Sequence, residues 1–419
     1  MTPDPTTTHL AQATEQMAVL ARIREDHHVT QPLAGQRLAL CGHITAETAV
    51  QVETLTALGA DTAWCASSTS TTDDRIAALM RGRGIPVTGT RGMSEADLHA
   101  GVEETLRTWP QGPTMVLDEG ALLITALHTT QAHLPAPVLA TEKTPDGLAE
   151  LHRLTRHTPL RFPVIKSDES FGKDVIDNPH GTAQSLIETI MAAAGRMLAG
   201  KVFVVAGYGR VGSGVAAKAR GLGARVIVTE VRPTRALIAT LDGFEVLPMN
   251  EAARIGDLFC TVTGTPGVLR EHHFALLKNG AVLANGGHLP HEIDLAALDR
   301  TARERTPAAH PGSEVLTFAD GRRVYLIGGG NIANLAAGRG NVSEVMDVTF
   351  ASQVLALCLS VKEAPSWPAG LRELPEECDQ YVAAALARTM GIHLDLDPAG
   401  APAPAPSVGA QPNRDHHAH

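Results

Sequence analysis

The sequence has few aromatic residues and few charges. Phe, Trp and Tyr make up 3% of its 419 residues and charged residues 19%, whereas apolar residues make up 44%. A chain of this length has room for two or three domains and for a sizeable buried core. The composition, rich in small and aliphatic residues, therefore favours an α/β protein over a β-sandwich with an aromatic core.

A basic surface and paired cysteines are also missing. The formal net charge is −10, so the attraction that nucleic-acid phosphates require is not available and we expect no nucleic-acid partner. The five cysteines are dispersed, with no CxxC pair. Such spacing is typical of reduced thiols in a cytoplasmic protein and gives no reason to expect a metal site.

Long hydrophobic segments are absent as well. The N-terminal stretch MTPDPTTTHL has no basic region followed by an apolar run, so it does not resemble a signal peptide. The most apolar helical pattern, 341–361, is interrupted by Glu344, Asp347 and Gln353, whereas a membrane span needs about 20 nearly uninterrupted apolar residues. We therefore expect a buried helix there and no membrane association.

What is present is an alternation of strand and helix patterns in two series. Apolar runs at 36–43 and 61–65 flank a helical pattern at 46–60, which predicts a βαβ unit and a parallel sheet. A second series of five short apolar runs starts at Lys201 and resembles a doubly wound nucleotide-binding sheet. We place a domain boundary near residue 184, before a helical pattern at 185–200. The Pro/Ala-rich segment 397–419 predicts a disordered tail.

The most specific local motif is a glycine-rich turn between a strand and a helix, in VVAGYGRVGSG. Gly207 permits a tight turn, Gly209 lets the backbone approach a pyrophosphate, and Gly212 allows close helix–strand packing. The helix N-terminus would present free N–H groups to the phosphates. Glu230, at the end of the next strand, would accept from the adenosine ribose hydroxyls. This arrangement predicts a dinucleotide site that prefers NAD to NADP.

A second motif crowds a lysine, a carboxylate and an amide together in FGKDVIDNPHGTAQS. Lys173 precedes Asp177 by four residues and Asn178 follows at once. Taken alone, this is an i,i+4 ion pair on a helix surface, which contributes little to stability. If the pair were buried, the lysine could act as a base toward a hydroxyl group. Both interpretations are open at this point.

Seven stretches occur in the order of one enzyme family and together cover roughly residues 10–390. They are CGHITAETAVQVETLTALGA, KDVIDNPHGTAQS, VVAGYGRVGSG, GARVIVTE, TVTGTPGVL, NGGHLPHEID and the Asn-Leu pair at 334–335. The sequence resembles the S-adenosylhomocysteine hydrolase (adenosylhomocysteinase) family. The resemblance implies a bilobed α/β protein. Its NAD-binding Rossmann domain (185–340) would be inserted into a substrate-binding domain (1–184 and 341–396).

The resemblance also implies a redox-neutral reaction on an adenine nucleoside. Tightly bound NAD first oxidises the ribose 3′-hydroxyl to a ketone. The ketone acidifies the neighbouring C4′–H, a base removes that proton, and the 5′ substituent leaves. Water or another nucleophile then adds and the ketone is reduced again. Lys173 and Asp177 would act at the sugar hydroxyl, with Asn178 positioning the lysine or the cofactor carboxamide.

Further roles follow from the resemblance position by position. His43 and His288 correspond to histidines near the 5′ position, candidates for proton transfer to the leaving group, and Glu119 is a further catalytic candidate. Substrate contacts are implied for Thr45 and Glu47, which would recognise the adenine, and for Glu142, Lys143, Thr144 and Asn341. Cofactor contacts are implied for Gly207, Gly209, Arg210, Val211, Gly212, Glu230, Thr261, Thr263, Gly264, Asn285, Gly287 and Asn334.

Several positions depart from the family pattern. Glu119 stands where relatives have an aspartate, Lys143 where they have a carboxylate at the ribose, and Asn341 where they have a histidine near the adenine. The run SSTSTT at 67–72 replaces a family asparagine. The family's final Lys/Tyr segment, which reaches a neighbouring subunit's cofactor, is replaced by the Pro/Ala-rich tail. We therefore expect either a homodimer or a homotetramer.

These departures lead to a specific functional hypothesis. We predict NAD-dependent, redox-neutral elimination on an adenine nucleoside, with loss of water from its hydroxymethyl group, as in a nucleoside dehydratase of specialised metabolism. The alternatives are a true adenosylhomocysteinase, a net dehydrogenase that releases a keto-nucleoside, and a catalytically silent NAD-binding regulator. Retention of Lys173, Asp177, His43 and His288 argues against the silent regulator.

Overall fold

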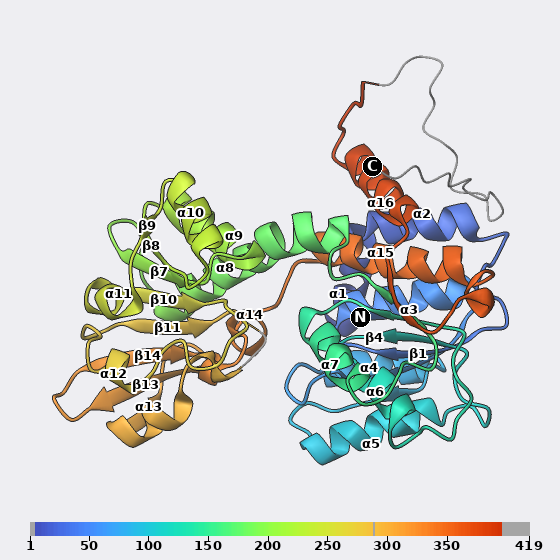
Figure 1. Ribbon diagram of the computed structural model, residues 1–419, viewed down its shortest axis with the longest axis horizontal. Helices are drawn as coiled ribbons and strands as arrows, with labels where there is room; N and C mark the ends of the chain where they lie inside the picture. Colours follow the sequence, from blue (N-terminus) through green and yellow to red (C-terminus); the bar gives the residue numbers. More distant parts are fainter. Residues whose placement is uncertain (1–4, 288–289, 396–419) are drawn as a thin grey trace. The chain divides into compact units, whose positions relative to one another are not determined.

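The computed structural model describes residues 5–287 and 290–395, so His288 and the tail at 397–419 lie outside the described residues. The chain divides into two units (Figure 1). Unit 2 is Lys173–Met346, and unit 1 is formed by the described residues on either side of it. The divisions fall at 172/173 and 346/347, whereas the sequence placed them at 184/185 and 340/341.

Unit 1 is built on a seven-stranded sheet in which every neighbouring pair is parallel, in the order β15-β6-β5-β4-β1-β2-β3. Its strands are β1 Arg37–Cys41, β2 Asp61–Cys65, β3 Val87–Thr88, β4 Met115–Asp118, β5 Leu139–Glu142, β6 Pro163–Lys166 and β15 Gly370–Glu373. Its helices are α1 Pro5–Gln16, α2 Ala18–His27, α3 Ala46–Ala57, α4 Asp74–Gly82, α5 Glu95–Leu106, α6 Leu122–His128, α7 Pro145–Thr155, α15 Ser343–Ser360, η4 Ala364–Ser366 and α16 Glu376–Thr389. The expected βαβ unit at 36–65 is present as β1, α3 and β2.

The C-terminal part of the chain completes unit 1. Strand β15 pairs with β6 at the edge of the sheet, and α16 lies beside α2, where Tyr381 donates to Asp26 at 2.6 Å (Figure 1). Asp347 on α15 accepts from the backbone N–H groups of Val19 and Leu20 at 2.7 and 2.8 Å. These bonds cap α2, which has no side-chain cap of its own. The N-terminal part of the chain thus forms two successive helices, α1 and α2.

Unit 2 is built on an eight-stranded sheet in the order β12-β13-β14-β11-β10-β7-β8-β9. Its strands are β7 Val202–Ala206, β8 Arg225–Thr229, β9 Glu245–Val246, β10 Leu258–Thr261, β11 Val282–Asn285, β12 Ala302–Pro307, β13 Ser313–Phe318 and β14 Arg323–Ile327. Its helices are η1 Gly172–Thr182, α8 Ala183–Ala194, α9 Arg210–Gly221, α10 Pro233–Leu241, α11 Met249–Ile255, α12 Glu271–Phe274, η2 Pro290–Glu292, α13 Leu295–Thr301, η3 Gly328–Gly330 and α14 Ala333–Ala336.

The sequence predicted only part of this sheet. Strands β7 to β11 correspond to the five apolar runs after Lys201 and pair in parallel. The pairs β12·β13 and β13·β14 are antiparallel and were not predicted, although β14 continues the parallel part beside β11. Asp320-Gly321 between the apolar runs of β13 and β14 was a usable signal, because this dipeptide favours a tight hairpin turn.

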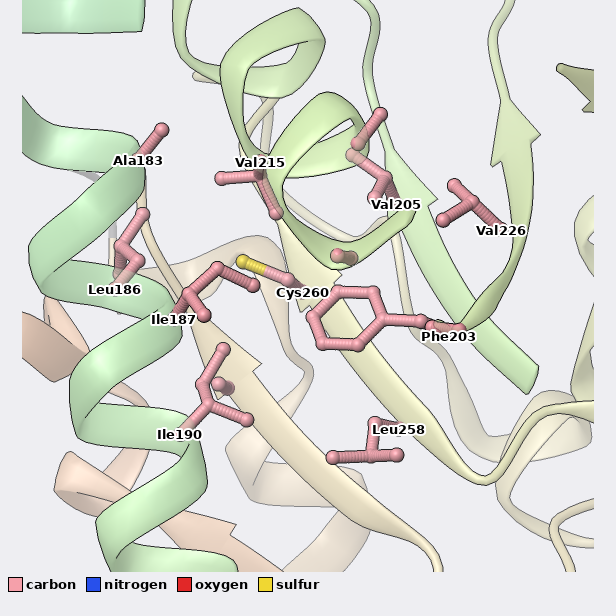
Figure 2. Close-up of a cluster of buried hydrophobic side chains, with 14 of the residues drawn as sticks. Ala183, Leu186, Ile187, Ile190, Phe203, Val205, Val215, Val226, Leu258 and Cys260 are labelled. Atoms are coloured by element: carbon pink, nitrogen blue, oxygen red, sulfur yellow. The ribbon is translucent and has the colours of Figure 1, made fainter. Parts of the chain in front are cut away.

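The core of unit 2 explains why α8 and α9 lie against the sheet. Leu186, Ile187 and Ile190 from α8 point toward Val215 on α9 and toward side chains of β7 and β10 (Figure 2). Phe203 and Cys260 are completely buried among them. Apolar residues three and four apart on α8 thus form one continuous stripe. This packing fixes the start of α8, and with it the end of η1, beside the first turns of α9.

Two sequence expectations concern burial. All five cysteines are buried and none is in a disulfide. Helix α15, which lies in the apolar pattern at 341–361, is buried over much of its length, including Val354, Leu355 and Leu357. Within the described part of the chain, no helix combines the length and the hydropathy that a bilayer crossing requires.

Candidate functional site

In unit 1, the candidate polar residues gather where neighbouring parallel strands end. His43 comes two residues after β1, and the Ser/Thr run 67–72 follows β2. On β4 and β5 the register pairs Asp118 with Glu142, so the next residues along, Glu119 and Lys143, are neighbours as well. The carboxyl ends of parallel strands are the usual place for a ligand site in such sheets.

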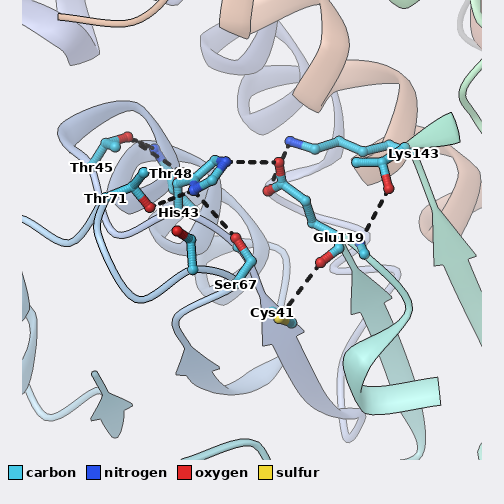
Figure 3. A network of polar contacts seen from close by, with 12 residues as sticks. Cys41, His43, Thr45, Thr48, Ser67, Thr71, Glu119 and Lys143 are labelled. Atoms are coloured by element: carbon cyan, nitrogen blue, oxygen red, sulfur yellow. Dashed lines mark hydrogen bonds and ion pairs between the residues drawn. The ribbon is translucent and has the colours of Figure 1, made fainter. Parts of the chain in front are cut away.

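His43, Glu119 and Lys143 form one connected polar network (Figure 3). His43 Nε2 lies 3.4 Å from Glu119 Oε1, and Lys143 Nζ lies 3.3 Å from Glu119 Oε2. On the other side of the imidazole, Nδ1 is 2.6 Å from Thr71 Oγ1 and 3.4 Å from Ser67 Oγ. The carboxylate and the two hydroxyls therefore fix the ring of His43 from both sides.

Lys143 is buried although it carries a positive charge. Its side chain is 5% exposed, against 15% for Glu119, and its Nζ lies 4.4 Å from the centre of the Phe350 ring. A buried ammonium needs a partner of opposite charge, and Glu119 with the aromatic face supplies compensation. The structure thus pairs Lys143 with a carboxylate of its own unit.

Glu142 and Thr144 organise the loop that carries Glu119. Both carboxylate oxygens of Glu142 accept backbone N–H bonds, from Thr144 at 2.8 Å and Ala121 at 2.8 Å. Thr144 Oγ1 donates to Glu142 at 2.7 Å and accepts from the N–H of Gly147 at 2.9 Å, capping α7. A Cβ at Gly147 would lie 2.3 Å from the Glu142 side chain. Substrate contact by Glu142 and Thr144 stays a prediction.

Asp118 is the buried neighbour of Glu142. Its oxygens accept from the N–H groups of Glu119 at 3.0 Å and Ile124 at 2.8 Å. Burial raises the pKa of Asp118 to about 7. Burial, together with the nearby Asp118, raises the pKa of Glu142 to about 8. Two carboxyl groups that are fully shielded from solvent thus hold the 119–124 loop from adjacent strands.

Thr45 and Glu47 lie at the start of α3. Thr45 is the N-cap residue and accepts from the N–H of Thr48 at 3.4 Å. Glu47 is in the first turn and is partly exposed. Acidic residues are favourable at this end of a helix. Adenine recognition by these two residues stays a prediction.

In unit 2, Lys173 and Asp177 lie on η1, an eleven-residue π-helix that contains Pro179. Lys173 Nζ is 2.5 Å from Asp177 Oδ2, and the two side chains are 12% and 1% exposed. Asn178 follows on the same helix and is buried. This is not the exposed surface pair that the sequence alone allowed. Turns of π-helix occur frequently at functional sites.

A chain of hydrogen bonds connects Asp177 to Asn334. Asn341 Nδ2 donates to Asp177 Oδ1 at 2.6 Å, and Asn341 Oδ1 accepts from Ser185 Oγ at 2.8 Å. Ser185 Oγ accepts in turn from Asn334 Nδ2 at 2.8 Å. Thr182 also donates to Asp177, at 3.0 Å. Sequence reasoning placed Asn341 at the substrate and missed Ser185, because neither link is visible without the fold.

The glycine-rich turn has the geometry that its sequence predicted. Gly207 has a φ of +98°, which favours glycine, and Gly209 is the N-cap of α9, followed by Arg210 and Val211 as its first residues. A Cβ at Gly212 would lie 2.0 Å from the carbonyl oxygen of Gly207. Only glycine allows the first turn of α9 to approach the backbone of Gly207 this closely.

A cavity of about 720 Å³ opens beside this turn, lined by Gly207, Glu230, Arg232, Arg235, Thr263 and Arg270, among others. Glu230 accepts from the backbone N–H groups of Tyr208 at 2.8 Å, Val231 at 2.7 Å and Arg232 at 2.9 Å. Burial favours a raised pKa, but these donors and Arg235 outweigh it and hold the pKa of Glu230 below its usual value. A carboxylate at this place suits a ribose diol.

Glu292 orders the loop that brings Thr263 to the cavity, and it was not predicted. Its carboxylate accepts from the N–H groups of Thr263 at 2.9 Å and Gly264 at 2.7 Å, and burial raises its pKa. Asn285, at the end of β11, contacts the end of β10: Thr261 Oγ1 lies 3.2 Å from Asn285 Oδ1. The predicted cofactor residues Thr261, Thr263, Gly264, Asn285 and Gly287 (whose N–H donates to Asn285) are thus together in one loop cluster.

The donor and acceptor set fits NAD. The turn at 207–212 leaves backbone N–H groups at the start of α9 for a pyrophosphate, and Glu230 faces the cavity. Asn334 Oδ1 is buried and has no hydrogen-bond partner among the described residues. An unpaired buried acceptor is costly unless something donates to it, and a carboxamide N–H is a suitable donor. No group of three or more metal-binding side chains occurs within 5–287 and 290–395.

Fold and site together define an NAD-binding α/β enzyme of two units, one carrying a Rossmann-type sheet. Two family models match the chain: "S-adenosyl-L-homocysteine hydrolase" over residues 6–142 and "S-adenosyl-L-homocysteine hydrolase, NAD binding domain" over residues 178–340. The chain belongs to the S-adenosyl-L-homocysteine hydrolase family. This confirms the resemblance, the two-domain α/β fold class and NAD as the cofactor.

Curated relatives match over nearly the full chain. An adenosylhomocysteinase of Aquifex aeolicus (strain VF5) is 41% identical over 381 residues, which cover 90% of each protein. An adenosylhomocysteinase of Archaeoglobus fulgidus is 40% identical over 380 residues, covering 90% of this chain and 93% of that one. An S-inosyl-L-homocysteine hydrolase of Methanopyrus kandleri is 39% identical over 384 residues, covering 91% and 90%. These names support hydrolase chemistry and give no support to a dehydratase.

Proposed function

We propose that the protein is an NAD-dependent hydrolase of an S-nucleosylhomocysteine, with S-adenosylhomocysteine as the first substrate to test. The observation that carries the proposal is the buried Lys173–Asp177 pair on the same unit as the glycine-rich turn. The names of the relatives support thioether cleavage, and they include both adenosyl and inosyl substrates. Glu47, as an acceptor for an exocyclic amine, favours the adenosyl compound.

The first step assigned to this chain is removal of a proton from a sugar hydroxyl. NAD, when bound, supplies the reversible oxidation of the hydroxyl-bearing carbon. For that oxidation to proceed, the O–H proton must also leave, and we assign Lys173 as the group that accepts it. Asp177 then stabilises the ammonium group that forms, because it lies 2.5 Å away and is itself held by Asn341 and Thr182.

The second step is loss of the 5′ substituent. The sugar ketone acidifies the adjacent C–H bond, so that a proton can be removed there and the C5′–S bond can break. We assign protonation of the leaving sulfur to His43, whose ring is fixed by Glu119 and Thr71. Water then adds at C5′, and the ketone is reduced again, so that no net oxidation occurs. His288 keeps the proton-transfer role that its family position implies.

Water loss from a nucleoside hydroxymethyl group is retained as a second candidate. Lys143 is the observation that favours it, because an ammonium paired with Glu119 replaces a second carboxylate at the end of β5. The same oxidation and C–H acidification would then expel hydroxide in place of a thiolate, and no nucleophile would be added back. The relatives named above favour thioether cleavage.

One experiment separates the two candidates. Purified protein saturated with NAD is incubated in parallel with S-adenosylhomocysteine, S-inosylhomocysteine and adenosine, and the products are followed by thiol titration and mass spectrometry. Hydrolysis predicts one thiol and one nucleoside per substrate consumed. Dehydration predicts no thiol and a nucleoside product lighter by one water.

The control is Lys173→Met, which removes the proposed base and is expected to abolish turnover while leaving circular dichroism unchanged. If the NAD-saturated wild type releases no thiol from either thioether, the hydrolase proposal is wrong. A product lighter by one water would then support the second candidate.

A further inference from the structure

The π-helix η1 is attached to the dinucleotide turn through an ion pair that sequence analysis did not single out. Asp174, directly after Lys173, pairs through Oδ1 with Nε of Arg210. Arg210 is the first residue of α9 and directly follows Gly209 of the turn. One short contact thus connects the helix that carries the proposed base to the N-terminus at which a pyrophosphate would bind.

A second contact fixes the other end of η1 to the same helix. A Cβ at Gly214 on α9 would lie 2.1 Å from the carbonyl oxygen of Pro179 and 2.8 Å from Cβ of Ala183. The two backbones therefore touch directly, and only glycine permits this approach. Helix α9 thus contacts η1 near both of its ends, through Asp174 and through Pro179.

The Asp174–Arg210 pair does not serve folding stability. Both side chains are 37% exposed, and ion pairs between groups of that exposure contribute little to the free energy of unfolding. Its location suggests another role, because the pair holds Asp174, the residue directly after Lys173. A π-helix of eleven residues is also unusual, since π-helical turns mostly occur singly.

From these contacts we infer that Asp174 is a positioning residue, which through Arg210 makes the placement of Lys173 depend on a filled dinucleotide turn. Binding of the pyrophosphate orders the first turn of α9. Arg210 then holds Asp174, and Asp174 fixes the adjacent Lys173 next to Asp177. The expected effect on kcat rests on the proposed function. The expected effect of NAD on the order of η1 does not, because it requires only that this chain binds NAD.

The structural test is amide hydrogen exchange, measured by mass spectrometry with and without saturating NAD. In the wild type, NAD should slow exchange both in a peptide covering the turn 207–214 and in a peptide covering η1. In Asp174→Asn, slowing should persist in the turn peptide and be lost in the η1 peptide. Asp174→Glu, which keeps the carboxylate, should restore it. Retained slowing of η1 in Asp174→Asn would overturn the inference, whatever the enzyme catalyses.

The kinetic test distinguishes positioning from a loss of cofactor. Asp174→Asn should bind NAD as tightly as the wild type, because the substitution leaves the glycine-rich turn 207–212 unchanged, and its KM should change little. Its kcat should fall about tenfold, since a displaced base acts only on the chemical step. A substrate deuterated at the oxidised carbon should show a larger isotope effect on kcat in the variant. An unchanged kcat with an unchanged isotope effect would overturn the inference.

The matched control is Arg225→Ala, which removes another exposed ion pair of unit 2, that with Glu245 at 2.7 Å. It should leave exchange in η1, NAD binding and kcat at wild-type values. If the wild type itself shows no turnover on any substrate, the proposed function has failed, and the hydrogen-exchange comparison still decides the role of Asp174.

Discussion

Asn341 and Asp177, 164 positions apart in the sequence, are joined by a 2.6 Å hydrogen bond from Nδ2 to Oδ1. The bond leaves the other oxygen of Asp177 to Lys173. Asn341 is held in turn by Ser185. The amide therefore sets which oxygen of the carboxylate faces the lysine.

Asn341→Ala should slow catalysis more than it weakens the fold. Losing a hydrogen bond to a charged acceptor costs about 1.5–3 kcal/mol, which corresponds to a decrease in kcat of about 10- to 100-fold if the bond acts in the chemical step. Steady-state kinetics with NAD saturating measures the effect. Ser185→Ala, one hydrogen bond further from Asp177, should lower kcat less. An equal or larger loss would contradict the idea that Ser185 acts on Asp177 only through Asn341.

Lys143→Met should destabilise unit 1. It removes the lysine cation from the largely buried Glu119, and breaking a buried ion pair in this way costs about 3–5 kcal/mol. The cost is less here because Glu119 is 15% exposed and keeps His43 beside it. Urea denaturation measures the change. Adding Glu119→Gln should recover much of the loss, because the carboxylate charge that Lys143 compensated is then gone. Lys166→Met, which removes the exposed pair with Glu373, should cost less than about 1 kcal/mol.

The contribution of Asp118 and Glu142 to the free energy of unfolding should decrease as pH rises from about 5 to about 8. Burial raises the pKa of Asp118 to about 7 and of Glu142 to about 8, from ordinary values of 3.8 and 4.5. At a pH between the ordinary and the raised pKa of each group, that group binds more protons in the folded than in the unfolded state. Raising the pH in this range therefore favours unfolding. Glu142→Gln should flatten the profile measured by urea denaturation. Glu150→Gln, in an exposed pair with Arg153, should leave its slope unchanged.

Gly212→Ala should abolish NAD binding. The new Cβ would lie 2.0 Å from the carbonyl oxygen of Gly207, which forces α9 away from the turn. Isothermal calorimetry with NAD measures the loss. Gly221→Ala at the other end of α9 meets nothing within 4 Å and should bind NAD normally; if Gly212→Ala does so too, close approach at this turn is not needed for the cofactor.

The sequence predicted what depends on local pattern. Strands β7 to β11 follow from short apolar runs, and the turn at Gly207, Gly209 and Gly212 follows from glycine spacing next to a strand. The strands and the turn are both encoded in short stretches of consecutive residues. The hairpin of β13 and β14 also has a local signal, the dipeptide Asp320-Gly321 between two apolar runs.

The remaining site depends on contacts between distant residues. Lys143 meets Glu119 because β4 and β5 are neighbours in register, and strand order is not encoded in any one segment. Asp174 meets Arg210 because η1 packs on α9. The π-helix itself was not foreseen, because Pro179 favours a helix end and no simple periodicity marks an i→i+5 pattern.

Helix α15, with Asp347 and Phe350, and strand β15 complete unit 1. Strands β1 to β6 of that unit are synthesised much earlier, before unit 2. Helix α2 is capped by Asp347, Lys143 is covered by Phe350, and the sheet edge at β6 is paired by β15. Unit 2, by contrast, is one uninterrupted stretch of chain. On the ribosome, the middle of the polypeptide can therefore mature first, and the beginning must wait for the end.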